Sequence, residues 1–254
     1  MLDYILVPLL GFMPAVVLFA IIVILDRRRP EPIGQLFKAF AFGMFPAIII
    51  ISVAYLLELC GVDISGTGPF TTAFCVAAIP EEGLKLLMLW LILRRNKYYD
   101  EMFDGIVYAC CIGLGFAAFE NVLYLWDFDM GTMVARATLA VPGHFLDAVM
   151  MGYFYSLVRF TTKRRGLNMA LTFLVPMLAH GLYDYAIMSA EYVNMWFTIL
   201  IVLVIFPAIV AGSWIIAIRF IKRHLKSDSE NKELAAKYAA HPKEEETAEE
   251  ASEQ

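Results

Sequence analysis

Charge is scarce in this 254-residue chain, since only 18% of its residues are charged while 60% are hydrophobic and the mean hydropathy is +0.67. Such a composition is far more apolar than a soluble domain needs and indicates a membrane protein. The net charge of −5 comes from the end of the chain, where 9 of the 25 acidic but 4 of the 20 basic residues follow Leu225. The rest carries no basic face, which excludes nucleic acid as a partner.

Cysteine is scarce as well, and the four cysteines lack the CxxC spacing of metal and redox motifs. Cys75, Cys110 and Cys111 fall inside apolar runs, so we expect small buried side chains and no disulfide frame. A basic leader is also missing, because the first apolar run starts directly after Met1 and contains the acidic Asp3. This run therefore predicts a retained membrane span and not a cleaved signal peptide.

Seven apolar stretches are long enough to cross roughly 30 Å of hydrocarbon, which takes about 20 helical residues. They cover residues 2–25, 33–57, 69–93, 105–126, 136–158, 167–189 and 196–220. The prediction is an all-α polytopic membrane bundle of about seven transmembrane helices. We expect residues 1–225 to form the integral membrane domain, and residues 226–254 to form an acidic cytoplasmic tail that is flexible or partly helical.

The connections between these stretches alternate strictly in charge. Lys and Arg cluster at residues 27–29, 94–97, 163–165 and 219–226, whereas residues 58–68, 127–135 and 190–195 contain neither. The positive-inside rule then predicts an outside N-terminus and a cytoplasmic C-terminus. The chain shows no internal repeat of the kind that many transporters use.

Charged side chains interrupt the third apolar stretch near its middle. Glu81, Glu82 and Lys85 follow Pro80 within five positions, and each charge would cost about 2.5–3.5 kcal/mol if it faced lipid unpaired. We therefore expect all three to face the protein interior, where Pro80 loosens the preceding turn. A structural ion pair that ties helices together is the alternative interpretation.

The next stretch carries an isolated acid, Glu120, followed by Asn121. Small residues recur every four positions earlier in the same stretch, at Gly105, Ala109, Gly113 and Ala117. Such a stripe lets another helix approach closely. Glu120 and Asn121 are then expected beside a helix contact, although Asn121 alone could be an interhelical hydrogen bond.

Histidines beside acids occur in the next two stretches. His144 precedes Asp147 by one turn, and His180 and Asp184 share a face at i,i+4. A rise of about 1.5 Å per residue places Glu81, Glu120, His144 and His180 roughly 9–18 Å below the outer face. The polar groups should therefore meet in the outer half of the membrane. A lone histidine in a membrane span is usually a core residue with its hydrogen bonds satisfied, but both of these histidines lie beside an acid.

Acids and imidazoles in a cavity of low dielectric constant are what amide hydrolysis by an activated water needs. No Ser or Cys lies beside these histidines in the sequence, so water is the expected nucleophile. Glu120, His144 and His180 would supply the two-His, one-Glu ligand set of a catalytic zinc site, with Glu81 or Glu82 as the base. The spacing is not HExxH, so a divalent metal such as Zn²⁺ is inferred from residue types alone.

These motifs resemble the PrsW family of bacterial intramembrane proteases. The resemblance rests on Glu81-Glu82-x-x-Lys85, on Asp104 to Tyr108 with Gly113 to Tyr124, on His144, and on His180-Gly181-Leu182-Tyr183-Asp184. It covers the third to sixth stretches in order. It implies a multi-pass protease of a bacterial cell membrane, within a group that also holds the type II CAAX prenyl endopeptidases.

The resemblance further implies a site-1 type cut in a single-pass membrane protein, an anti-sigma factor, near the extracytoplasmic face, which starts an envelope-stress response. It also implies catalytic roles for Glu81, Glu82, Lys85, Glu120, His144, His180 and Asp184. In this chain Lys85 follows the first Glu of the motif by four positions, whereas the CAAX branch has an Arg one position later. The chain also has Glu120 where that branch has His, and Asp184 where it has Asn. These differences argue against prenyl-protein processing and leave metal-dependent and metal-free sites both open.

Two other classes of function fit the same polar residues. Acid and histidine chains at membrane depth also serve as proton relays, so a proton- or ion-coupled transporter is one alternative. A non-catalytic membrane protein that binds peptides in the same cavity is the other. Proton-coupled flux in vesicles would identify the first, and peptide binding without product would identify the second.

Overall fold

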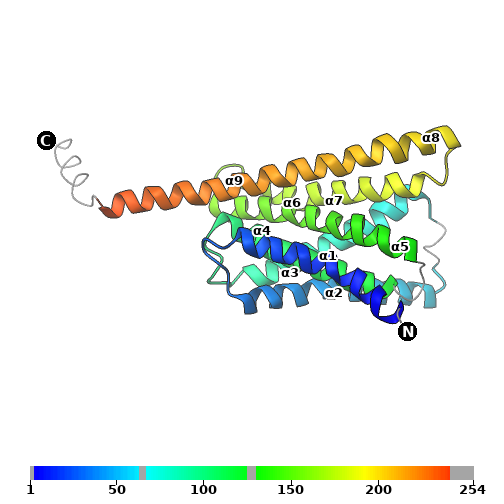
Figure 1. Cartoon of the computed structure of the whole chain (residues 1–254), viewed down its shortest axis with the longest axis horizontal. Coiled ribbons are helices and arrows are strands. Elements are labelled where there is room, and N and C mark those ends of the chain that lie inside the picture. Colours follow the sequence, from blue (N-terminus) through cyan, green and yellow to red (C-terminus); the bar gives the residue numbers. More distant parts are fainter. Residues whose placement is uncertain (1–2, 63–66, 125–129, 241–254) are drawn as a thin grey trace.

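The computed structural model describes residues 3–62, 67–124 and 130–240, and this part of the chain is all-helical (Figure 1). The α-helices are α1 (Asp3–Leu25), α2 (Ile33–Leu59), α3 (Ile79–Leu93), α4 (Met102–Tyr124), α5 (Met130–Ala135), α6 (Val141–Phe160), α7 (Arg165–Ser189), α8 (Met195–Leu200) and α9 (Phe206–Ala240). Three π-helical segments, η1 (Thr71–Ala78), η2 (Arg136–Ala140) and η3 (Ile201–Ile205), continue directly into α3, α6 and α9. Over the described residues the chain therefore forms seven continuous helical rods.

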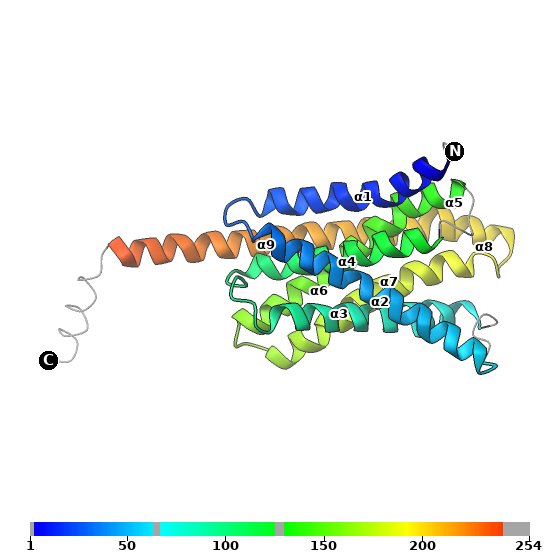
Figure 2. The same cartoon turned by 90° about the horizontal axis from the view of Figure 1, so that it is seen from below.

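The rods run in alternating directions along one bundle. The α1–α2, α3–α4 and α6–α7 connections lie at one end, together with the long C-terminal extension of α9 (Figures 1 and 2). Helices α2, α4 and α7 end at the opposite end of the bundle. The basic clusters of the sequence thus share one end, as the alternation predicts, while the side of the membrane that this end faces stays a prediction.

Four described helices are long and apolar enough to cross a membrane: Ile33–Leu59, Met102–Leu123, Arg165–Ser189 and Met195–Lys232. The chain is accordingly a multi-pass membrane protein. Residues 69–93 form one rod, as predicted, but three charged side chains near its middle lower its apolar character. The count of seven spans stays a prediction.

The last rod continues far beyond the predicted span 196–220, because helix α9 extends to Ala240. Its extension contacts the start of α4. The Asp228 carboxylate accepts hydrogen bonds from the backbone N–H groups of Met102 and Phe103 at 3.0 and 2.9 Å, and Lys232 pairs with Glu101 at 2.8 Å. The first part of the predicted tail, to residue 240, is therefore helical, and residues 241–254 lie outside the described residues.

Helix α4 is the centre of the bundle, and its apolar side chains are buried along most of its length. It packs against α2 and α6 where glycines let backbones approach. A Cβ on Gly105 would lie 2.0 Å from the Ser156 hydroxyl of α6, and one on Gly113 would lie 2.8 Å from the Ala148 Cβ. These contacts confirm the predicted close approach of a second helix along the small-residue stripe.

Replacing Gly152 with valine should push α4 and α6 apart. A Cβ at this position would lie 2.4 Å from the Gly105 carbonyl oxygen and 2.6 Å from the Ile106 Cα, both of them backbone atoms that cannot rotate away. We expect a loss of about 1–3 kcal/mol or more in unfolding free energy, measured by thermal or denaturant unfolding in detergent. Gly212→Val is the matched control, because nothing lies within 4 Å of the Cβ it would add; equal stability of the two variants would contradict this packing.

Each π-helical segment ends shortly before a proline: η1 before Pro80, η2 before Pro142 and η3 before Pro207. Proline donates no backbone hydrogen bond, and its ring clashes with the carbonyl four residues earlier. The preceding turn therefore widens into the π form, which is common at functional sites. Two of these widened turns immediately precede α3 and α6.

The described cysteines are all free. Cys110 and Cys111 are buried, as predicted, whereas Cys75 is exposed on η1. The prediction of a buried Cys75 is wrong because an apolar run in a membrane helix also covers the face turned away from the protein core.

Two carboxyl groups between α1 and α2 lie buried at the end of the bundle that carries the basic connections. Burial raises the pKa of Glu31 to about 7, although a hydrogen bond from the Tyr108 hydroxyl acts to lower it. Burial also raises the pKa of Asp26 to about 6. A raised carboxyl pKa means that the folded protein binds protons that the unfolded chain has released, so unfolding free energy falls as pH rises from about 4.5 to 7.

Glu31→Gln should therefore lose less stability than the wild type between pH 5 and 8, because the amide has no charge to bury. Melting temperature measured against pH in detergent checks this expectation. Glu191→Gln, on an exposed residue, is the control. Parallel curves for the wild type and the Glu31 variant would refute it.

Candidate active site

Helix α3 turns its three charged side chains into the bundle. Glu81, Glu82 and Lys85 are 8%, 0% and 3% exposed, and all three follow Pro80 in the first turns of the helix. The widened η1 turn and Pro80 set the start of α3. The prediction that these charges face the protein interior is confirmed.

The Lys85 ammonium lies at the centre of the polar cluster. Its Nζ donates to Glu82 Oε1 at 2.8 Å and to Glu81 Oε2 at 3.3 Å, so both acids share one cation. The same Nζ lies 3.2 Å from His144 Nδ1 and 3.8 Å from the centre of the Phe116 ring. Buried charges are tolerated when they are paired and hydrogen-bonded in this way.

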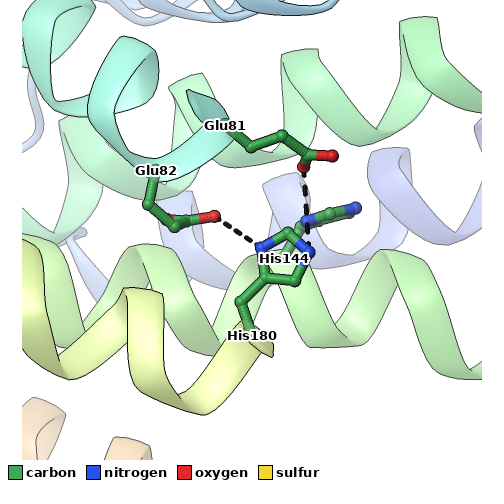
Figure 3. Close-up of side chains that lie close together, drawn as sticks. All are labelled: Glu81, Glu82, His144 and His180. Carbon is green, nitrogen blue, oxygen red and sulfur yellow. Dashed lines mark hydrogen bonds and ion pairs between the residues drawn. The ribbon is translucent and has the colours of Figure 1, made fainter. Parts of the chain in front are cut away.

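His180 reaches the two glutamates from α7. Its Nδ1 lies 3.0 Å from Glu82 Oε1 and its Nε2 lies 3.9 Å from Glu81 Oε2 (Figure 3). The same Nε2 lies 3.3 Å from Asp184 Oδ2, one turn later on the helix. The predicted i,i+4 arrangement is thus observed, and both ring nitrogens of His180 face carboxylates.

His144 reaches the cluster from α6, with its ring centre 5.3 Å from that of His180. Its two nitrogens point to different groups: Nδ1 to Lys85 inside the cluster and Nε2 to Glu120 Oε2 at 3.0 Å. Glu120 on α4 therefore lies behind His144, and a second cation, Arg136, pairs with it at 2.8 Å. The seven residues predicted for the site lie in one connected cluster.

A cavity of about 320 Å³ opens beside this cluster. Among the described residues its wall includes Glu81, Glu120, His144, His180 and Asp184, but not Glu82 or Lys85. The cavity also reaches Thr72 near the start of η1 and Met188 near the end of α7. It therefore lies toward the end of the bundle opposite the basic connections.

Comparison with known protein families gives a match over most of the chain. The model of the PrsW family of intramembrane metalloproteases matches residues 31–212, which include every residue of the cluster. The chain belongs to the PrsW family. It is consequently an intramembrane peptidase.

Several relatives carry the name Protease PrsW. The protein of Geobacillus kaustophilus is 34% identical over 71% of this chain and 79% of its own length. That of Bacillus subtilis is 34% identical over 69% and 79%, and that of Oceanobacillus iheyensis is 29% identical over 84% and 93%. No solved structure matches the chain.

PrsW proteins are described as metalloproteases, and the donor atoms of this cluster suit a metal. One ligand atom each from Glu81, Glu82, His144 and His180 lies within 4.8 Å of the others. Within the described part of the chain, the buried Glu82 Oε2 has no hydrogen-bond partner and is a spare ligand atom. Two carboxylates and two imidazoles are donors that zinc accepts.

This set of four differs from the predicted ligands Glu120, His144 and His180. Glu120 contacts the Nε2 of His144, on the far side of the ring from the cluster. Zinc bonds to nitrogen and oxygen are about 2.0–2.2 Å long, and Lys85 Nζ already lies among the donor atoms. The ammonium and a metal ion cannot occupy the same space.

Two residues of this PrsW site are missing from the sequence-based set. Arg136 pairs with Glu120, and Asp147 lines the cavity while 6% exposed. Asp147 could have been included because it follows His144 by one turn. Arg136 could have been recognised as a cation at the start of an apolar stretch whose preceding connection carries no Lys or Arg.

Proposed function

We propose that this PrsW protein cuts a single-pass membrane protein by water activated at Glu81. The observation that supports this choice is the cavity wall, which includes the Glu81 side chain but not Glu82. A general base must reach the water that it deprotonates, and only a carboxylate on the cavity wall can do so. Glu82 holds Lys85 and His180 in place from its fully buried position.

The other residues act around that water. Glu81 removes a proton from the water while the water oxygen attacks the carbonyl carbon of the scissile peptide bond. The C–N bond then breaks as the protonated Glu81 gives that proton to the leaving amine nitrogen. The positive charges of Lys85 and of His180, whose two N–H groups donate to Glu82 and Asp184, stabilise the negative charge that develops on the carbonyl oxygen. Asp184 orients His180 by accepting a hydrogen bond at Nε2, and Glu120 orients His144 in the same way.

A divalent metal such as Zn²⁺, when bound, would polarise the carbonyl group and lower the pKa of the attacking water. The residues that would hold the metal are Glu81, Glu82, His144 and His180. Glu120 would not bind the metal directly but would contact the Nε2 of His144. Three of these four residues, Glu81, Glu82 and His144, also contact Lys85.

The substrate class follows from the place of the cavity. The positive-inside rule assigns the basic connections to the cytoplasm, so a cavity toward the opposite end of the bundle lies in the outer half of the membrane. A site-1 type cut close to the extracytoplasmic face of a single-pass protein fits that depth. An anti-sigma factor is the substrate that we propose, with an envelope-stress response as the outcome.

A comparison of membrane proteomes tests this function. Cells with the wild type are compared under envelope stress with cells that carry both Glu81→Gln and His180→Ala. We expect one single-pass protein, an anti-sigma factor, to have a shortened ectodomain only with the wild type. Identical processing of every single-pass protein in both strains would contradict the proposed cleavage. Shortening of a protein unrelated to sigma factors would support the cleavage but contradict the proposed anti-sigma factor substrate.

A further inference from the structure

Arg136 is a charged residue in the cavity wall that neither the motifs nor the proposed reaction uses. It is the first residue of η2, the widened turn that leads into α6 and His144. Its Nη2 lies 2.8 Å from Glu120 Oε2, and its Nε donates to Asn121 Oδ1 at 3.1 Å. One guanidinium thus holds two consecutive side chains at the end of α4.

The Glu120 oxygen that Arg136 contacts also contacts His144. Glu120 Oε2 lies 2.8 Å from Arg136 Nη2 and 3.0 Å from His144 Nε2. A carboxylate can only accept, so His144 carries its proton on Nε2 and donates it to Glu120. His144 Nδ1 is then left with a lone pair, and it accepts from the Lys85 ammonium at 3.2 Å.

This geometry points to Arg136 as a positioning residue of the PrsW reaction. We infer that Arg136 fixes the position of the Glu120 carboxylate, and that Glu120 thereby selects the His144 tautomer with the proton on Nε2 and the Nδ1 lone pair facing the polar cluster. The inference rests on the proposed function, because it assigns Arg136 a part in the same site. It also accounts for Asn121, whose buried amide oxygen receives the second bond of the guanidinium.

An arginine suits this task better than a lysine. Its planar group presents donors in a fixed fork, so it can bind Glu120 and Asn121 together and hold the orientation of both. A lysine keeps the charge but places a single nitrogen, so it can satisfy one of the two acceptors well. We therefore expect Arg136→Lys to recover part of the activity that Arg136→Gln loses.

A double-mutant cycle on the full-length protein in detergent tests the inference. The kcat and KM for cleavage of a purified single-pass reporter are measured for the wild type, Arg136→Gln, Glu120→Ala and the two changes combined. Removal of a group that orients such a histidine typically costs about 10–100-fold. We expect that loss in kcat with little change in KM for Arg136→Gln, and a double variant no slower than Glu120→Ala alone.

The histidine tautomer gives a readout that a merely structural role would not change. In protein labelled with ¹⁵N histidine, the His144 signals, assigned with His144→Gln, should report a proton on Nε2 in the wild type and a mixture of tautomers in Arg136→Gln. Arg29→Gln is the matched control, because Arg29 also contacts two acidic side chains, Asp100 and Glu101, but at the other end of the bundle.

The outcomes separate this inference from the proposed function. Full activity of Glu120→Ala would contradict the site as proposed. Loss of activity in Glu120→Ala with full activity in Arg136→Gln would overturn the inference alone. Losses that multiply in the double variant, or a change in KM without a change in kcat, would show that Arg136 acts independently of Glu120 and would also overturn it.

Discussion

Glu81→Gln is expected to lower kcat for peptide cleavage by about 10²–10⁴-fold, the usual contribution of a general base. The amide keeps the shape of the side chain and can still accept a hydrogen bond from Lys85, which the wild-type carboxylate contacts at 3.3 Å. The variant should therefore insert into the membrane and melt close to the wild type. Rates measured with a purified single-pass reporter, together with thermal melting in detergent, check both statements.

Glu82→Gln is the informative comparison, because the two glutamates are neighbours with different surroundings. Glu82 is fully buried and holds both Lys85 at 2.8 Å and His180 at 3.0 Å, whereas Glu81 is in the cavity wall. We expect Glu82→Gln to lower stability as well as activity, since it removes a buried charge from two charge-assisted contacts. An intact rate in Glu81→Gln with a lost rate in a well-folded Glu82→Gln would assign the base to Glu82.

Lys85→Met should destabilise the protein by about 3–5 kcal/mol when metal is absent, because it leaves buried carboxylates without their cation. Lys85 Nζ contacts both Glu81 and Glu82, and its side chain is 3% exposed. Methionine fills a similar volume without charge. Thermal unfolding with a chelator present measures the effect.

Added Zn²⁺ should restore much of that stability in Lys85→Met and much less in the wild type. A ligand that binds only the folded state stabilises it, and in the variant the ammonium no longer occupies the space among the donor atoms. Lys97→Met, on an exposed lysine, should change stability by less than about 0.5 kcal/mol. A Lys85 variant that melts with the wild type in chelator, or that Zn²⁺ does not stabilise, would refute a shared lysine and metal position.

The sequence predicts the helices and the inward orientation of the charged side chains, because both depend on strong local signals. A charge inside an apolar run is so costly that Glu81, Glu82 and Lys85 had to face the protein interior, and the structure places them there. The i,i+4 spacing of His180 and Asp184 also predicts their contact, because helical geometry alone determines it.

Features that depend on contacts between helices could not be predicted in the same way. The sequence does not show that Glu120 contacts the Nε2 of His144, since this contact depends on how α4 and α6 cross at their glycines. It likewise could not separate Glu81 from Glu82 as the base, because adjacent residues differ only in the side of α3 that they occupy. The extension of α9 to Ala240 is stabilised in part by Asp228 and Lys232, which contact residues 101–103, distant in the sequence.

The most direct test of the central claim is cleavage by purified components in liposomes. The single-pass protein found in the proteome comparison is reconstituted with the wild type or with the variant that carries Glu81→Gln and His180→Ala, and the products are identified by mass spectrometry. We predict one cut near the membrane surface on the side of the α7–α8 connection with the wild type, and intact substrate with the equally folded variant. Equal cleavage by both proteins, or an intact substrate with the wild type, would contradict proteolysis at the Glu81 and His180 site.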